Sequence, residues 1–263
     1  MSSPQSGIDQ RHPSSVAQNR PEETRHNTAE TVLETQALTK TVASGERQLT
    51  ILAGVTMQIM AGESVAILGS SGAGKSTLLS LLAGLDAPSG GELKLFGRAM
   101  NELDEDGRAQ LRAGQVGFVF QNFQLLPTLT ALENVLLPLE LTRAGADTSA
   151  ARHWLERVGL GERLHHLPKQ LSGGEQQRVA IARAFVADPR LVFADEPTGN
   201  LDRDTGARVA ELLFGLNREA GTTLVLVTHD LALAARCDRA LELEAGQLRP
   251  RHLEPETSRE PGR

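Results

Sequence analysis

The sequence predicts an α/β fold: a mostly parallel sheet covered by helices, an antiparallel β subdomain and an inserted helical subdomain. Segments that are apolar on both faces are typical of the central strands of a parallel sheet. Segments with apolar residues at helical spacing lie between them. This alternation indicates βαβ units around a covered sheet. The buried strands are expected at residues 116–120, 191–194 and 223–227, and the helices at 76–83, 175–186 and 205–219.

Further strands are expected near the start of the domain. Residues 55–59 and 63–68 are short apolar runs separated by Ala61 and Gly62, a pair that favours a hairpin turn. Residues 92–96 alternate between polar and apolar side chains, which is typical of a half-buried antiparallel strand.

The stretch from about residue 122 to 187 interrupts the alternation. It contains helical patterns at 133–141 and 150–158 but no run typical of a buried strand. We therefore expect a helical subdomain inserted in a folded domain of residues 31–249. Residues 1–30 and 250–263 are expected to be a disordered and a flexible tail, because they offer too little apolar surface to offset the entropy cost of ordering.

The composition narrows the class of protein. The formal net charge of -6 argues against a nucleic-acid partner, since phosphate-contacting faces are usually basic. Cys237 is the only cysteine, so no intrachain disulfide is expected and a reduced core residue is the simplest interpretation. The sequence has neither a secretory signal nor the roughly 18 to 20 apolar residues needed to cross a bilayer. We expect a cytoplasmic chain, with any membrane component on another polypeptide.

A phosphate-binding loop is predicted where the strand ending at Leu68 meets the following helix. The sequence there matches G-x-x-x-x-G-K-[ST]. Glycines let backbone N–H groups turn toward an anion, and the helix N-terminus adds a partial positive charge. Lys75 would bind the β- and γ-phosphates and the Ser76 hydroxyl would bind Mg²⁺. The residues expected to contact ATP are Gly69, Ser70, Ser71, Gly72, Ala73, Gly74, Lys75, Ser76 and Thr77.

Two carboxylates follow the buried strand at 191–194. An acidic residue at this place in a P-loop NTPase core holds Mg²⁺, usually through water, which suits Asp195. Glu196 is placed to polarise an attacking water as general base. Such a pair alone would equally suit a helix N-cap or a solvated loop, and the phosphate loop upstream favours the catalytic interpretation.

Residues 171–178, Leu-Ser-Gly-Gly-Glu-Gln-Gln-Arg, resemble the signature of the ATP-binding cassette (ABC) ATPases. Ser172 is a good N-cap, and Gly173 and Gly174 expose backbone N–H groups, so this is a second candidate for binding an anion. The resemblance implies that these three residues close on the ATP held by a second copy of the chain, giving a head-to-tail homodimer.

The same resemblance implies roles for residues at other segment ends. Gln121 would touch Mg²⁺ and the attacking water, Asp202 lies in a loop that crosses the dimer seam, and His229 would contact the γ-phosphate. Catalysis is thus assigned to Glu196, His229 and Gln121, and the metal to Ser76, Gln121 and Asp195. The resemblance covers residues 31–248.

Residues 117–134 and 194–202 resemble, more narrowly, the lipoprotein-release and macrolide-export ABC subfamily. This implies a permease with few transmembrane helices and a large periplasmic domain. The chain would lie on the inner face of the cell membrane and drive export or lipid and lipoprotein extraction. The alternatives are a soluble ABC ATPase acting on nucleic acid or the ribosome, and a non-catalytic nucleotide-sensing module. A single cassette without a basic stripe argues against the first, and Glu196 with His229 argues against the second.

One departure from the family concerns the adenine. The family usually stacks it on an aromatic residue near the positions of Thr41 and Val42, but this chain has no tyrosine and neither residue is aromatic. Base stacking is worth about 1–3 kcal/mol, so we expect adenine to be held weakly by Val42 and its loop, and GTP to compete well. The other cluster considered, His153, His165 and His166, is expected to be solvated and not to bind metal.

Overall fold

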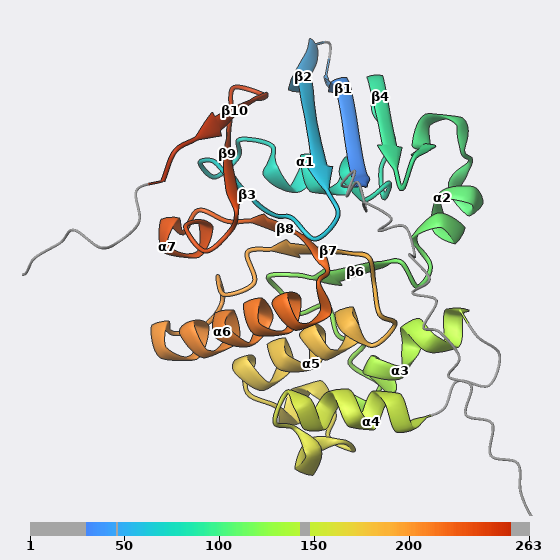
Figure 1. Cartoon of the computed structure of the whole chain (residues 1–263), viewed down its shortest axis with the longest axis vertical. Helices are drawn as coiled ribbons and strands as arrows, with labels where there is room; N and C mark the ends of the chain where they lie inside the picture. The colour runs from blue at the N-terminus through green and yellow to red at the C-terminus, as the bar shows by residue number, and fades with distance from the viewer. Residues whose placement is uncertain (1–29, 46, 143–147, 254–263) are drawn as a thin grey trace, which may run out of the picture.

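The computed structural model describes residues 30–45, 47–142 and 148–253, which form two sheets separated and covered by helices (Figure 1). The six-stranded sheet has the order β10-β9-β3-β8-β7-β6 and is parallel from β9 to β6, with β10 antiparallel at its edge. This confirms the predicted α/β fold. The strands are β3 (Ser64–Leu68), β6 (Val116–Val119), β7 (Leu191–Asp195), β8 (Thr223–Val227), β9 (Arg239–Glu244) and β10 (Gln247–Arg251).

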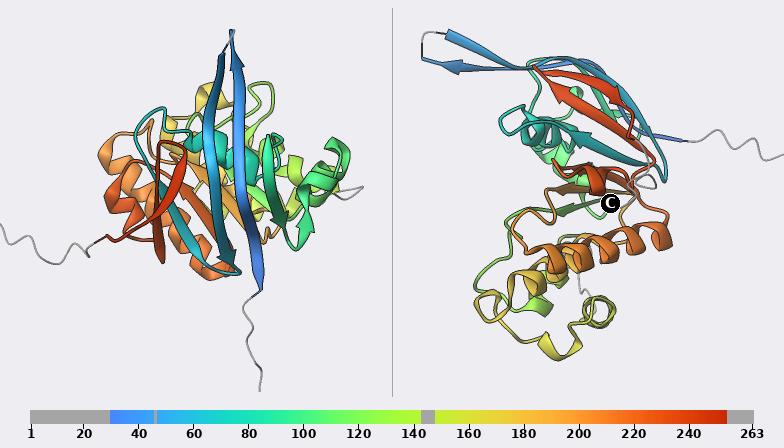
Figure 2. Two further views of the ribbon diagram at one scale, coloured as in Figure 1. Left: turned by 90° about the horizontal axis from the view of Figure 1, so that it is seen from above. Right: turned by 90° about the vertical axis from the view of Figure 1, so that its left-hand side faces the viewer.

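The second sheet is antiparallel, with the order β2-β1-β4-β5. It lies over α1, on the opposite side of the parallel sheet from α5 and α6 (Figures 1 and 2). Its strands are β1 (Thr31–Ser44), β2 (Arg47–Met60), β4 (Gly90–Leu95) and β5 (Arg98–Ala99). The half-buried strand predicted at 92–96 is therefore present as β4.

The hairpin predicted between residues 55–59 and 63–68 is wrong. β2 pairs with β1, and β3 lies between β9 and β8 in the other sheet. All of β3 is buried, which an interior strand of a covered parallel sheet achieves and a half-exposed hairpin strand does not. Ala61 and Gly62 turn the chain from one sheet to the other.

Helices fill both faces of the parallel sheet. The leucines of α1 pack in a core between the two sheets, and α5 and α6 pack in a second core on the opposite face. The helices are α1 (Lys75–Leu82), α2 (Glu105–Arg112), α3 (Ala131–Thr142), α4 (Thr148–Arg157), α5 (Gly173–Phe185), α6 (Arg203–Ala220) and α7 (Leu231–Ala234). Short 3₁₀ turns cover Met100–Glu102, Gly161–Arg163 and Pro168–Gln170.

The segment predicted as a helical subdomain holds α3, α4, two 3₁₀ turns and α5, and the part of it that the structure describes contains no strand. Trp154 of α4 stacks on Phe185 of α5 with ring centroids 5.8 Å apart, so it packs the subdomain together. Most of both predicted tails, residues 1–29 and 254–263, lies outside the described residues. β10 continues to Arg251, past the predicted domain end at 249. Among the described helices, none combines the length and apolar character needed to span a bilayer.

Candidate active site

The phosphate loop connects β3 to α1 and leaves the start of that helix open to a ligand. Gly74 precedes the helix with φ 94°, and a Cβ there would lie 2.9 Å from Ile51 Cγ2, so only glycine fits. No side chain caps α1, and its first turn holds no acidic residue. The free N–H groups and the helix dipole therefore favour an anion such as a phosphate.

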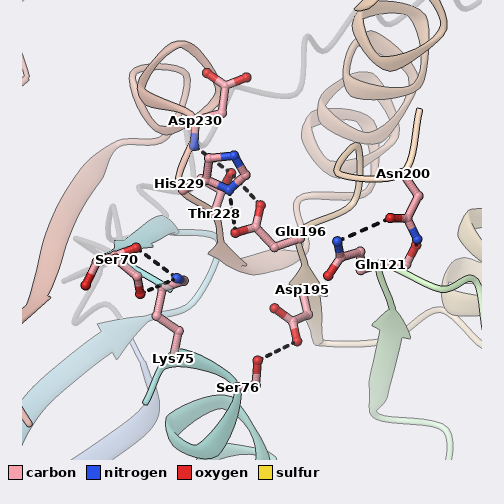
Figure 3. A network of polar contacts seen from close by, with 11 residues as sticks. Ser70, Lys75, Ser76, Gln121, Asp195, Glu196, Asn200, Thr228, His229 and Asp230 are labelled. Carbon is pink, nitrogen blue, oxygen red and sulfur yellow. Dashed lines mark hydrogen bonds and ion pairs between the residues drawn. The ribbon is translucent and has the colours of Figure 1, made fainter. Parts of the chain in front are cut away.

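Lys75 and Ser76 sit in the first turn of α1 and reach different partners (Figure 3). The Lys75 ammonium donates to the carbonyl oxygens of Gly69 at 2.8 Å and Ser70 at 3.0 Å, so it is folded over the loop. The Ser76 hydroxyl donates to Asp195 Oδ2 at 3.1 Å. The predicted cation Lys75 and two of the three predicted metal ligands, Ser76 and Asp195, thus lie at one end of the sheet.

Asp195 ends β7 and is half-buried. Burial raises the pKa of its carboxyl, while the hydrogen bond from Ser76 opposes the rise; the charges of Glu196 and Lys75 act in opposite directions. Carboxylate and hydroxyl oxygens suit Mg²⁺, which usually takes its remaining ligands from water and substrate phosphates. Within the described residues no cluster of His, Cys, Asp or Glu could hold a metal unaided. The donor set therefore fits a Mg²⁺ ion that arrives with a nucleotide.

Glu196 follows immediately, in a left-handed conformation with φ 45°. Its N–H donates to the Val227 carbonyl at 2.8 Å, which fixes the residue against the end of β8. The carboxylate contacts His229 Nδ1 at 2.8 Å and accepts from the Thr228 hydroxyl at 3.3 Å (Figure 3). Such backbone strain is common at functional sites. The turn aims Glu196 at the same space as the phosphate loop.

A cavity of about 700 Å³ joins these groups. The structure brings together most of the predicted phosphate-loop residues with Gln121, Asp195, Glu196 and His229, from segments far apart in the sequence. Two further residues that we did not predict, Leu49 and Ile51 of β2, form part of its wall. Gly69, Ser70 and Ala73 shape the loop without lining the cavity. The lining residues are Leu49, Ile51, Ser71, Gly72, Gly74, Lys75, Ser76, Thr77, Gln121, Asp195, Glu196 and His229.

The residues of the predicted ABC signature lie outside this cavity, and so does Asp202. Ser172 caps α5 in a reciprocal pair with Glu175, whose carboxylate accepts from the Ser172 N–H at 2.8 Å. Gly174 is buried, and a Cβ there would lie 2.4 Å from Thr205 Cγ2, so this glycine also allows α5 to approach α6 closely. Asp202 caps α6 by accepting from the Thr205 N–H at 3.0 Å. None of Ser172, Gly173, Gly174 and Asp202 lines the cavity of its own chain.

Comparison with known proteins decides the family. The sequence profile of the family described as ABC transporter matches residues 52–199. The chain belongs to the ABC transporter family. It is an ATP-binding ATPase subunit of an ABC transporter, as predicted.

Similar ABC proteins align with more than four-fifths of the chain. The chain is 59% identical over 222 residues to the uncharacterized ABC transporter ATP-binding protein YbbA of Escherichia coli K12, covering 84% of this chain and 97% of that one. It is 51% identical over 222 residues to the lipoprotein-releasing system ATP-binding protein LolD of Xanthomonas campestris pv. campestris strain 8004, covering 83% and 92%. This relative confirms the predicted subfamily resemblance.

A solved structure supports the same assignment for this ABC ATPase. A dimeric post-hydrolysis state of the ATP-binding cassette MJ0796, bound to ADP and Pi, matches with a TM-score of 0.79 and 42% identity. The match covers 85% of this chain and 99% of that one.

The cluster His153, His165 and His166 forms no metal group in the part of the chain that the structure describes. His153 and His165 are exposed on the helical subdomain, as predicted, whereas His166 is partly buried.

Proposed function

We propose that two copies of this ABC ATPase close head-to-tail around two ATP molecules and drive a separate membrane permease in export or lipid and lipoprotein extraction. The observation that carries the dimer is the separation of the two helix starts that were predicted to contact the ATP phosphates. The α1 start lies in the cavity, whereas the exposed Ser172 at the start of α5 lies outside it. A second chain would place its own α5 start over this cavity. The dimeric MJ0796 cassette is a precedent in a similar protein.

In the proposed mechanism, the phosphate loop and α1 hold the ATP phosphates, and Lys75 leaves its loop carbonyls to bind them. Ser76, Asp195 and Gln121 would hold Mg²⁺, which when bound neutralises charge on the phosphates. Glu196 takes the proton of the attacking water. Its contact with His229 Nδ1 at 2.8 Å orients the imidazole, and we assign the other ring nitrogen to the γ-phosphate.

The dimer can be tested with Glu196→Gln. This variant keeps the side-chain volume but removes the base, so ATP binding should persist while turnover falls at least 100-fold. Size-exclusion chromatography with light scattering should show a dimer in Mg²⁺ and ATP, and a monomer in ADP. Wild-type turnover in this variant would contradict the assignment of Glu196 as the base. A monomer under all conditions would contradict the proposed closure of two chains.

The permease contact is assigned to a groove of about 510 Å³ between α2 and α3. Leu141, near the end of α3, is 81% exposed in a groove that also includes Leu137, Pro138 and Val116. A group of apolar side chains that line one groove and are rimmed by polar residues is typical of a protein-binding surface. The groove also includes Arg183 of α5, so it adjoins the helical subdomain that would transmit the stroke.

Affinity purification from gently solubilised membranes tests this contact, and with it the proposed place of the chain at the inner face of the cell membrane. We expect a multi-span membrane protein to co-purify with the wild type and to be lost with Leu141→Asp. The matched control is Leu231→Asp, at a residue 54% exposed on the start of α7. Recovery of only soluble proteins with the wild type, or equal loss with both variants, would contradict the assignment.

A further inference from the structure

The segment that follows β6 has a backbone that needs external support. Phe123 and Gln124 both adopt left-handed conformations, with φ 58° and 46°. These are unfavourable for residues with a Cβ and persist where surrounding groups hold them. The segment contains Gln121, which lines the nucleotide cavity, and it leads into the helical subdomain.

Arg183 of α5 supports the far end of this segment. Its guanidinium donates to the carbonyl oxygens of Phe123 at 3.0 Å and Gln124 at 2.7 Å. These bonds fix the strained pair to the helical subdomain. They do not reach Gln121, whose side chain needs another partner to point in one direction.

Asn200 supplies that partner from the loop between β7 and α6. Its Nδ2 donates to the Gln121 carbonyl at 3.0 Å and to Asn122 Oδ1 at 2.7 Å. Its Oδ1 accepts from Gln121 Nε2 at 3.3 Å (Figure 3). Both amide protons and one acceptor site are therefore directed at Gln121 and Asn122. This pattern also fixes which end of the amide is oxygen.

The Asn200 loop is tied to the catalytic glutamate. The Gly199 N–H donates to the Glu196 carbonyl at 3.0 Å, so Gly199 and Glu196 belong to one tight turn. A Cβ on Gly199 would lie 3.0 Å from Gln121 Nε2, so the two loops are in close contact. Asn200 therefore links the Glu196 turn to Gln121.

We propose that Asn200 is a positioning residue for ATP hydrolysis: it fixes the Gln121 amide and couples that segment to the Glu196 turn. Asn200 does not line the cavity, so its effect on turnover must pass through Gln121. The inference rests on the proposed role of Gln121 at the metal and the attacking water. Misplacing a reacting group by about 1 Å costs on the order of 100-fold in rate, so loss of this support should cost about tenfold.

A double-mutant cycle tests the coupling. Steady-state ATPase would be measured for the wild type, Asn200→Ala, Gln121→Ala and the double variant. We expect Asn200→Ala to lower kcat about tenfold with KM for ATP changed less than about twofold, because the phosphate loop is untouched. In the Gln121→Ala background the same substitution should change kcat less than about twofold, since the side-chain amide that Asn200 positions is gone.

Two further variants keep the test independent of folding. Asn200→Asp preserves size and the acceptor for Gln121 Nε2 but places an oxygen against the Gln121 carbonyl, so it should reproduce the tenfold loss. Asn122→Ala removes one bond of Asn200 and leaves the link to Gln121, so it serves as the matched control with a loss below about threefold. Thermal melting of every variant reports whether the fold is intact.

The outcomes separate the two roles. A loss from Asn200→Ala that is equal in both backgrounds, or no loss at all, would overturn the role of Asn200 alone. Wild-type turnover in Gln121→Ala would overturn the role of Gln121 and the positioning proposal with it.

Discussion

Truncating Leu49 to alanine should weaken nucleotide binding about tenfold. Leu49 lines the cavity beside Ile51, and its cross-strand partner is Val42, the position where the sequence lacks an aromatic residue. Leu49 and Ile51 therefore form an aliphatic wall of the cavity, whereas Val42 does not line it, and we expect the nucleotide base to lie on this wall. Leu49 is 56% exposed, which leaves over half of the side chain for a base to cover.

The expected loss of binding free energy follows from the exposed fraction of Leu49. Burial is worth about 0.8 kcal/mol for each CH₂ group, and the substitution removes three carbons. Scaled by the exposed fraction, the loss is about 1.3 kcal/mol, or about tenfold in Kd. An aliphatic wall has no hydrogen-bonding groups to distinguish adenine from guanine. We therefore expect GTP to bind within about fivefold of ATP in the wild type.

Displacement of a fluorescent ATP analogue measures both affinities. Leu141→Ala, which truncates an exposed leucine outside the cavity, is the matched control and should leave Kd unchanged. A complementary variant, Val42→Tyr, should tighten ATP binding by about 1–3 kcal/mol if stacking is restored. Unchanged affinity in Leu49→Ala would refute the aliphatic wall, and ATP preferred over GTP by 100-fold would refute the lack of base selectivity.

Three further predictions concern other residues. Because burial raises the folded-state pKa of Asp195, its charge destabilises the fold above that pKa, and stability rises as the pH falls through it. Asp195→Asn should therefore raise Tm at pH 7.5 while abolishing Mg²⁺-dependent turnover. A lower Tm would contradict the inference that the charge of Asp195 destabilises the fold. Gly74→Ala should cost about 1–3 kcal/mol of stability and most ATP affinity, because φ is 94° and Ile51 blocks a Cβ. Gly215→Ala, in a helix with open space around it, is the control and should be neutral or stabilising. Burial raises the pKa of the Cys237 thiol to about 12, so iodoacetamide at pH 8 should react about a thousandfold more slowly with the native than with the denatured chain. Equal rates would show that Cys237 is exposed.

The phosphate loop and the acidic strand end could be predicted because their chemistry demands fixed residue types at fixed spacing. Gly74 and Lys75 follow a strand and open a helix, and Asp195 ends a strand that is apolar on both faces. Parallel strands place such ends at one edge of the sheet. These local patterns were sufficient to predict that Ser76, Asp195 and Glu196 lie close together.

Strand pairing could not be predicted in the same way. The sequence of the turn at Ala61 and Gly62 is equally compatible with a hairpin within one sheet and with a connection to another sheet. β1 carries register shifts around Ala37, which has φ 48°, and they disturb the alternation that marks a strand. The sequence analysis did not predict β1, so it could not place Leu49 opposite Val42. It therefore expected Val42 and its loop to contact the adenine and missed Leu49.

Asn200 escaped prediction for a related reason. It lies 79 positions from Gln121, and an asparagine in a loop is as typical of a turn as of a bridge between loops. The parallel pairing of β6 with β7, which the sequence analysis did not predict, places the two loops side by side.

The central claim is that each ATP is shared between two chains, and complementation of two inactive variants tests it most directly. Lys75→Ala disables the phosphate loop, and Ser172→Arg blocks the α5 start. In a head-to-tail dimer of one of each, one ATP site combines an intact loop with an intact α5 start. We predict that mixing the two inactive proteins restores ATPase activity, whereas the Lys75→Ala/Ser172→Arg double variant gives no increase when mixed with either single variant. A mixture of the two single variants that stays inactive, while each still binds its partner, would contradict the shared site.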